Sequence, residues 1–238
     1  MSQTGCVSEW MPLFMSFNRF AENYAGQAEF QRQVAGQLVQ DLTATGLGLD
    51  LGSGTGFVGQ ALRQQHPSLE WIEVDRSPAM LQQSSHPNRM CADGLRLPFA
   101  SNAFDWAVSS LALQWIGSAQ EMLRVLKPGA FYRVVLVLPG SLSELTRALD
   151  AIGRRHETLG QGTPEHWALD LPGQQRIETR TCEFPSPRAA LASVRDIGAG
   201  GQSGAAMSRS EYRQFLAALG SRLTYQLLWI EGHCPCES

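Results

Sequence analysis

The stretch LGLDLGSGTGFVG, residues 47–59, constrains the fold more than any other part of the chain. A short apolar run leads into glycines at positions 52, 54 and 56, and a further glycine follows at 59. Glycines in such a turn let the backbone approach a ligand closely, and the helix that follows offers unpaired N–H groups. Two nucleotide-binding motifs overlap: G-x-G-x-x-G read from Gly54, and D-x-G-x-G-x-G read from Asp50. The string therefore predicts a nucleotide-binding turn without choosing between the two motifs.

Expected strands and helices alternate from this turn onward. Apolar and β-branched runs favour strands, whereas apolar residues at helical spacing favour helices. The expected strands are residues 47–51, 69–75, 88–93, 104–110 and 130–138, and the expected helices are residues 56–67, 77–85 and 119–129. This alternation implies right-handed crossovers and a mostly parallel sheet with helices on both faces.

The remaining residues are expected to complete a single domain, because 238 residues suit one α/β unit. Residues 1–46 are expected to be helical, 47–140 to form the ligand-binding core, and 141–238 to complete the sheet and form a lid. The last segment should contain helices over 141–159, 187–198 and 208–220, with strands over 177–184 and 223–232. Ser208 and Glu211 match a helix capping box. The expected fold class is therefore α/β, with a doubly wound, seven-stranded, mostly parallel sheet.

The register of the glycine turn separates the two motifs. A dinucleotide motif that starts at Gly54 leaves Gly52 and Ser53 unexplained, although its first glycine should come directly off the strand. A motif that starts at Asp50 uses every glycine next to the strand. It also brings the Asp50 carboxylate to the amino-acid end of S-adenosylmethionine (SAM), and Gly59 then only packs the helix against the sheet. This register favours SAM.

Carboxylates after the next two strands support the same cofactor. Asp75 ends the second strand, where an acidic residue accepts hydrogen bonds from ribose hydroxyls. Asp93, followed by Gly94, comes after the third strand and can accept from the adenine amino group. Met80 is expected either on the adenine face or in the core. The predicted cofactor is SAM, and its predicted ligands are Asp50, Gly52, Gly54, Gly56, Asp75, Met80, Asp93 and Gly94.

Composition excludes several classes of protein. The net charge of -3 gives no support for nucleic-acid binding, and no run reaches the ~18 apolar residues that a membrane span needs. The five cysteines are scattered and odd in number, and no basic segment precedes an apolar run at the N-terminus, which together favour a cytoplasmic location. The Cys-Pro-Cys at 234–236 has no second ligand pair nearby, so no metal site is expected.

The sequence also resembles a known enzyme family. Residues 92–115, followed by MLRVLKPG at 122–129, look like a class I SAM-dependent methyltransferase with a Rossmann-like sheet. The closer resemblance is to the biotin-synthesis malonyl-acyl-carrier-protein O-methyltransferases, the BioC family. The stretches that carry it are FNRFAENYAGQAEFQRQ (17–33), SSLALQW (109–115), LPGSLSEL (138–145) and VRDIGAGG (194–201). Ser110 stands where that family usually has Asn, and Arg195 where it commonly has Lys.

The resemblance implies that the chain methylates the free carboxylate of malonyl-acyl carrier protein, or of malonyl-CoA, at the start of pimeloyl and biotin synthesis. An ionised carboxylate needs alignment and desolvation more than a general base. Tyr24, which the resemblance puts over the active site, is expected to direct that carboxylate. Gln114 and Trp115 follow the fourth strand, where open α/β sheets bind ligands, and Arg195 can pair with an anion.

The sequence leaves alternatives open for the methyl acceptor and for the partner protein. An acidic carrier needs a basic docking face, for which the candidates are Arg147, Arg154, Arg155 and Arg188. One alternative is a SAM-dependent methyltransferase for another small acceptor, such as a quinone precursor or a fatty acid. The other alternative is a SAM-binding partner subunit without catalysis.

Overall fold

A computed structural model describes residues 28–154, 171–195 and 207–236 of the chain. Seven strands form one sheet in the order β3-β2-β1-β4-β5-β7-β6. Their bounds are β1 Leu47–Leu51, β2 Glu70–Asp75, β3 Arg89–Cys91, β4 Phe104–Ser110, β5 Leu126–Val137, β6 Gln174–Glu183 and β7 Arg222–His233. Only the pairs that include β7 are antiparallel. The prediction of a doubly wound, mostly parallel sheet is confirmed.

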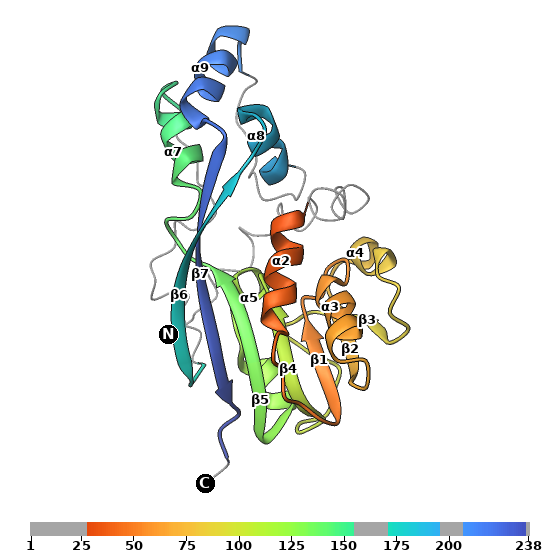
Figure 1. Cartoon of the computed structure of the whole chain (residues 1–238). Helices are drawn as coiled ribbons and strands as arrows, with labels where there is room; N and C mark the ends of the chain where they lie inside the picture. The colour runs from red at the N-terminus through yellow and green to blue at the C-terminus, as the bar shows by residue number, and fades with distance from the viewer. Residues whose placement is uncertain (1–27, 155–170, 196–206, 237–238) are drawn as a thin grey trace, which may run out of the picture.

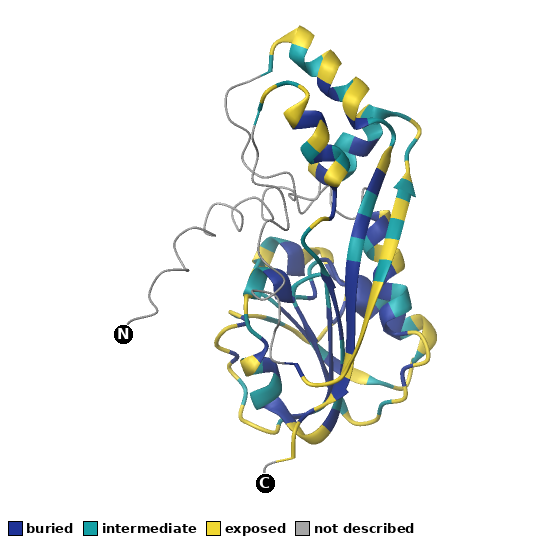
Figure 2. Cartoon of the chain, turned by 90° about the vertical axis from the view of Figure 1, so that its left-hand side faces the viewer, coloured by how far each residue is buried: buried dark blue, intermediate teal, exposed yellow. Residues whose placement is uncertain are grey.

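Helices cover both faces of this sheet, so its central strands are buried (Figures 1 and 2). On one face, α2 (Glu29–Leu38) and α3 (Phe57–Gln65) share a hydrophobic cluster with Trp106 and Val108 of β4. On the other face, α5 (Leu113–Ile116) and α6 (Gln120–Val125) pack against Leu49, Leu51 and neighbouring strand residues. The short helix α4 (Pro78–Gln83) contacts β2 and β3 and is capped by Ser77, as the sequence predicts.

The predicted helix over 119–129 is wrong at its end. Helix α6 stops at Val125, and residues 126–129 already belong to β5. Leu126 pairs with Phe104, and a register shift follows before Trp106 pairs with Phe131. Strand pairing therefore takes over from the helix before the Pro-Gly pair is reached. The helix predicted over 141–159 is also too long, because α7 covers Ser143–Asp150 and the chain has left the helix by Gly153 and Arg154.

Helices α7, α8 (Pro187–Arg195) and α9 (Arg209–Leu219) stand beyond the carboxyl ends of the parallel strands (Figure 1). The ribbon β6-β7 reaches them, because β7 pairs with β5 only up to Leu227 and Val137 but pairs with β6 as far as Arg222 and Glu183. The overhang is roughly 15 Å long at the usual rise of a strand. Ser208 and Glu211 form the predicted capping box at the start of α9.

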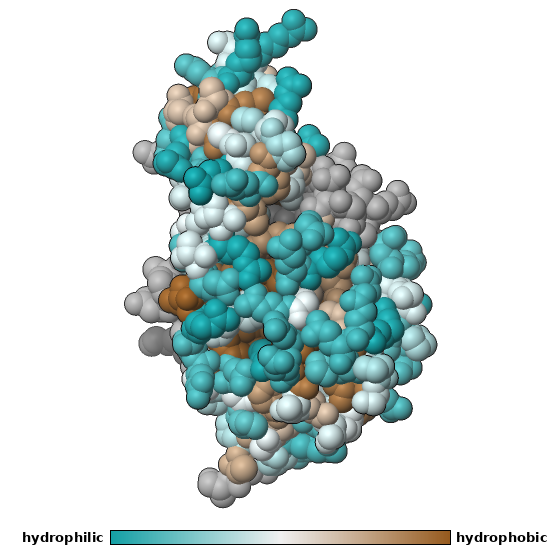
Figure 3. Space-filling view, in the orientation of Figure 1, coloured by the Kyte–Doolittle hydropathy of each residue, from teal (hydrophilic) through white to brown (hydrophobic). Residues whose placement is uncertain are grey.

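The outer surface is mostly hydrophilic on the face shown in Figure 3, with hydrophobic colour in small separate areas. No helix within the described ranges is both long enough and apolar enough to cross a bilayer. Cys234 is buried, with its thiol directed at the carbonyl of Leu123, and Cys236 is exposed. Among the described residues, no cluster of three His, Cys, Asp or Glu side chains is arranged to hold a metal ion.

Candidate active site

The glycine turn lies between β1 and α3, at the carboxyl edge of the sheet. Gly52, Gly54 and Gly56 all have left-handed backbone angles, with φ of 73°, 55° and 83°. The amides of Gly52 and Ser53 both donate to the carbonyl of Val74, at 2.7 and 3.0 Å, so the turn is docked on the end of β2. A Cβ atom at Gly54 would meet nothing within 4 Å. The backbone of Gly54 is therefore open to a ligand.

Gly59 has the packing role that the sequence predicts. A Cβ atom at this position would overlap the carboxylate of Glu73 and lie 3.3 Å from the indole nitrogen of Trp71. Glu73 is itself fully buried and accepts a 2.5 Å hydrogen bond from the hydroxyl of Ser84. Helix α3 can approach β2 this closely because residue 59 has no side chain.

Asp50 lies at the centre of the site, in β1. Its side chain is fully buried, and neither carboxylate oxygen has a hydrogen-bond partner among the described residues. Burial, followed by the charges of Glu73 and Asp75, raises the pKa of this carboxyl well above its ordinary value. The buried hydroxyls of Ser53 and Thr55 in the adjoining turn also lack partners there. Buried polar atoms are normally paired, so this cluster has the chemistry of a site for a ligand with hydrogen-bond donors.

Asp75 ends β2 and joins it to the turn. Its Oδ2 accepts from the amide of Gly54 at 2.8 Å, and its Oδ1 accepts from the amide of Ser77 at 2.8 Å. Burial raises the pKa of this carboxyl, and the backbone hydrogen bonds from Ser77 and Gly54 oppose that rise. Each carboxylate oxygen can accept a second hydrogen bond. Asp75 can therefore brace the turn and still receive the ribose hydroxyls.

The other predicted SAM ligands follow β2 and β3, the two strands on one side of β1 in the sheet. Asp93 is exposed after β3, and its Oδ1 accepts from the amide of Leu95 at 3.1 Å. Gly94 is buried against Ile116 of α5. Met80 is 4% exposed, near the start of α4, as the core alternative predicts. The roles of these residues toward SAM stay predictions.

Gln114 and Trp115 lie on α5, directly after β4. Gln114 is 6% exposed, and its Nε2 donates to the carbonyl of Leu111 at 2.7 Å. Trp115 is half-buried. Arg195 is exposed at the last residue of α8. Tyr24 and Arg155 lie outside the described residues.

Ser109 and Leu111 are two residues of this site that the sequence analysis did not select. The hydroxyl of Ser109, buried in β4, donates to the carbonyl of Leu51 at 2.7 Å and so fixes the end of β1. A serine inside an apolar strand was the available signal. Leu111 has a left-handed φ of 54°, and no sequence signal indicates that conformation for a leucine.

Comparison with known proteins agrees with this geometry. The family described as "Methyltransferase domain" matches residues 49–134, from β1 to β5. The crystal structure of the YcgJ protein from Bacillus subtilis superposes with a TM-score of 0.57 at 16% identity, covering 87% of this chain and 99% of that one, which establishes the fold. The buried oxygens of Asp50, Ser53 and Thr55 can accept hydrogen bonds, and the backbone at Gly54 is open. Both features fit the amino-acid end of SAM. Fold and site together define a class I SAM-dependent methyltransferase.

Longer matches identify the family within that class. A malonyl-[acyl-carrier protein] O-methyltransferase from Dechloromonas aromatica is 30% identical over 90% of this chain and 91% of its own length. Another with that name, from Erwinia pyrifoliae, is 32% identical over 96% and 97%. This chain belongs to the malonyl-[acyl-carrier protein] O-methyltransferase family.

Proposed function

We propose that this chain transfers a methyl group from SAM to the free carboxylate of a malonyl group held on acyl carrier protein, early in biotin synthesis. The observation that carries the proposal is the match to relatives of that name over nine-tenths of both chains. The site adds a physical reason. The fully buried Asp50 carboxylate has no partner of its own among the described residues, and it lies where the glycine turn leaves the sheet.

The reaction forms one oxygen–carbon bond and breaks one sulfur–carbon bond. SAM supplies the electrophilic methyl group on a positively charged sulfur. The malonyl carboxylate is ionised at neutral pH, so the protein has to orient it and keep water away. Tyr24 and Arg195 are the proposed contacts to this carboxylate, and Trp115 is proposed to form part of the wall around it. Asp50 would hold the ammonium end of SAM, and Asp75 its ribose.

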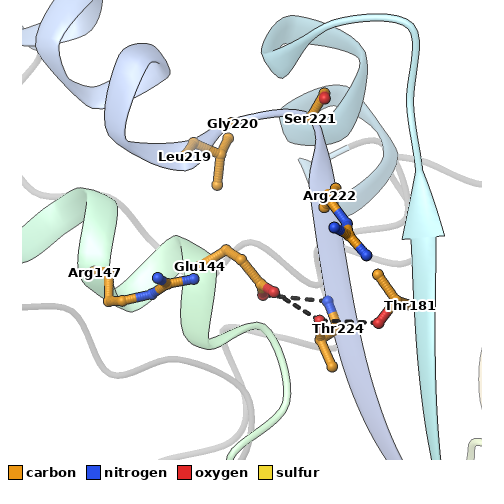
Figure 4. Close-up of a pocket in the computed structure, with 8 residues that line it drawn as sticks. All are labelled: Glu144, Arg147, Thr181, Leu219, Gly220, Ser221, Arg222 and Thr224. Atoms are coloured by element: carbon orange, nitrogen blue, oxygen red, sulfur yellow. Dashed lines mark hydrogen bonds between the residues drawn. The ribbon is translucent and has the colours of Figure 1, made fainter.

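A groove on the helical extension supports a carrier-bound substrate. The groove encloses about 330 Å³ between α7, the end of α9 and the start of β7 (Figure 4). Arg147 and Arg222 lie on its two sides. Its one carboxylate, Glu144, accepts from the amide and the hydroxyl of Thr224 at 3.2 and 2.7 Å, so hydrogen bonds already satisfy that charge. Two exposed guanidinium groups suit an acidic partner.

Arg222 also pairs with Glu183, but at 3.6 Å and with 66% of its side chain exposed. Of the other docking candidates, Arg154 pairs with Glu211 at 3.2 Å with only 24% of its side chain exposed, so it is less available to a partner. Arg188 is exposed at the start of α8. We therefore propose Arg147 and Arg222 as the main contacts for the carrier, with Arg188 as a further one. A cytoplasmic location follows from the proposed pathway and agrees with the free thiols of the four described cysteines.

The direct test incubates the purified chain with SAM and malonyl-loaded carrier protein, and detects the methyl ester by mass spectrometry. The absence of ester at saturating SAM would rule out the proposal. Ester formed on another acceptor alone, such as a fatty acid, would favour the small-acceptor alternative. SAM binding without transfer to any acceptor would favour the non-catalytic partner. In cells, the gene should restore growth without biotin to a strain that lacks this methylation step.

A further inference from the structure

We infer that Gln114 is a positioning residue, whose side-chain amide holds Leu111 in a left-handed turn that keeps two SAM-binding loops in place. The two loops are the glycine turn at 52–56 and the Asp93–Gly94 segment. This role does not depend on which molecule accepts the methyl group.

The strained turn begins where β4 ends. The amide of Leu111 donates to the carbonyl of Val135 at 2.8 Å, which is the last link between β4 and the neighbouring β5. The chain then turns through Leu111 with φ of 54° and enters α5 at Leu113. The left-handed region is unfavourable for a leucine, and such a residue persists only where its surroundings hold it there.

Gln114 provides that hold. The residue is 6% exposed, and its Nε2 donates to the carbonyl of Leu111 at 2.7 Å. A carbonyl oxygen only accepts hydrogen bonds, so the amide nitrogen of Gln114 has to face it and Oε1 has to point away. Oε1 is buried and has no partner among the described residues. The hydrogen bond to Leu111 is thus the one contact that fixes the orientation of the amide within that part of the chain.

The segment that follows Leu111 touches both loops. A Cβ atom at Gly52 would overlap the side chain of Ala112, so Ala112 rests directly on the glycine turn. A Cβ atom at Gly94 would lie 2.8 Å from Cδ1 of Ile116, at the other end of α5. The segment from Ala112 to Ile116 therefore contacts both loops: the glycine turn, expected at the amino-acid end of SAM, and the Asp93–Gly94 segment, expected at its adenine.

A change at Gln114 would therefore reach SAM through Leu111. Without the amide donor, Leu111 can relax to a negative φ, which moves Ala112 away from Gly52 and Ile116 away from Gly94. Both loops would lose these contacts, and the affinity for SAM would fall even when no acceptor is present.

The test is a rescue experiment that uses SAM binding, measured by calorimetry without any acceptor. Gln114→Leu removes the donor at similar size, and we expect the Kd for SAM to rise about tenfold, as for a lost buried hydrogen bond. Leu111→Asn, added to Gln114→Leu, should bring the Kd back to within about threefold of wild type, because Asn adopts the left-handed conformation at lower cost. Leu111→Gly is the second rescuing variant.

Asn102→Gly is the matched control, since Asn102 is also left-handed, with φ of 60°, but is exposed on the loop before β4. It should not restore SAM binding to Gln114→Leu. Wild-type affinity in Gln114→Leu would overturn the inference. It would also fail if neither substitution at Leu111 restored binding, because Gln114 would then act by touching a ligand. If Gln114→Leu does not fold, the yield of folded protein replaces SAM affinity as the measurement. Recovery by Leu111→Asn but not by Asn102→Gly would support the inference, and no recovery by Leu111→Asn would overturn it.

Discussion

The amide of Gly54 donates a 2.8 Å hydrogen bond to Oδ2 of Asp75, which ties the glycine turn after β1 to the end of β2. The residue predicted to bind ribose is thus also a structural brace for the residues predicted to bind the rest of SAM. A single substitution at Asp75 should affect both functions.

We expect Asp75→Ala to weaken SAM binding by roughly 10- to 100-fold, because the ribose acceptor and the brace on Gly54 are lost together. Calorimetric titration with SAM measures the change. Asp105→Ala is the matched control, since Asp105 accepts from the amide of Leu47 at 3.0 Å at the opposite end of β1. That variant should lose stability and keep its SAM affinity. Unchanged SAM affinity in Asp75→Ala would refute the assigned role.

Asp50 makes stability depend on pH. Its pKa is raised in the folded protein, so between the ordinary value of 3.8 and the raised value the folded state binds more protons than the unfolded state. The stability that this carboxyl contributes is present below that window and is lost as pH rises through it. Asp50→Asn removes the buried charge and should stabilise the SAM-free protein at neutral pH by about 1 kcal/mol or more.

The same substitution should weaken SAM binding, since a carboxylate attracts an ammonium group more strongly than an amide does. Urea unfolding at mildly acidic and at neutral pH, with and without SAM, measures both effects. Wild type should lose more stability than Asp50→Asn as the pH rises. Equal pH dependence in the two proteins would contradict the assignment of the titration to Asp50.

Two glycines offer a paired test of packing. Gly59→Ala should destabilise the fold by about 1–3 kcal/mol, because its methyl group would overlap the buried Glu73 carboxylate. Gly36→Ala, in α2, meets nothing within 4 Å and should stabilise by about 0.5–1 kcal/mol through helix propensity. Denaturant unfolding compares the two variants. Stabilisation by both substitutions would show that α3 is not held against Glu73.

The groove on the extension can be tested by charge reversal. Arg147→Glu with Arg222→Glu should raise the KM for malonyl-carrier protein about three- to tenfold, and should reduce its sensitivity to salt. The KM values for SAM and malonyl-CoA should stay unchanged. Lys127→Glu is the control. Lys127 lies at the start of β5, at the amino ends of the parallel strands and far from the extension, and it is paired with Asp105. An equal rise for malonyl-CoA would place the effect in the active site instead of a docking surface.

The sequence predicted the sheet well where local pattern and packing agree. Strands β1 and β4 have the predicted bounds, since each is an apolar run that ends at a turn. The boundary between α6 and β5 was missed because the pairing of Leu126 with Phe104 is a contact between distant residues, and a Pro-Gly pair suggested a later stop. The role of Gly59 was predictable, since the register of the motif left it no other function.

The details of the site were less accessible. The type and spacing of Asp50, Asp75 and Asp93 indicated where SAM should bind. The hydrogen bond from Gly54 to Asp75 joins residues 21 positions apart, so it depends on tertiary structure that the local pattern does not show. The strain at Leu111 runs against the preference of its residue type, so only the folded chain reveals it.

The overhang of β6 and β7 carries helices α7, α8 and α9 beyond the carboxyl ends of the parallel strands (Figure 1). Beyond the pair Leu227–Val137, β7 pairs with β6. There the carbonyl of Gln226 accepts one backbone hydrogen bond from the amide of Leu138, and the carbonyl of Thr224 accepts one from the amide of Leu142. The glycine turn, Asp75 and the Leu111 turn follow or end β1, β2 and β4, before the overhang begins. A chimera that exchanges residues 141–222 with those of another family member should keep the predicted SAM ligands Asp50 and Asp75 and the glycine turn, while it exchanges Arg195 and the groove beside Arg147. Part of the proposed acceptor side could thus be exchanged apart from the predicted SAM ligands, whereas Tyr24 and Trp115 would remain those of this chain.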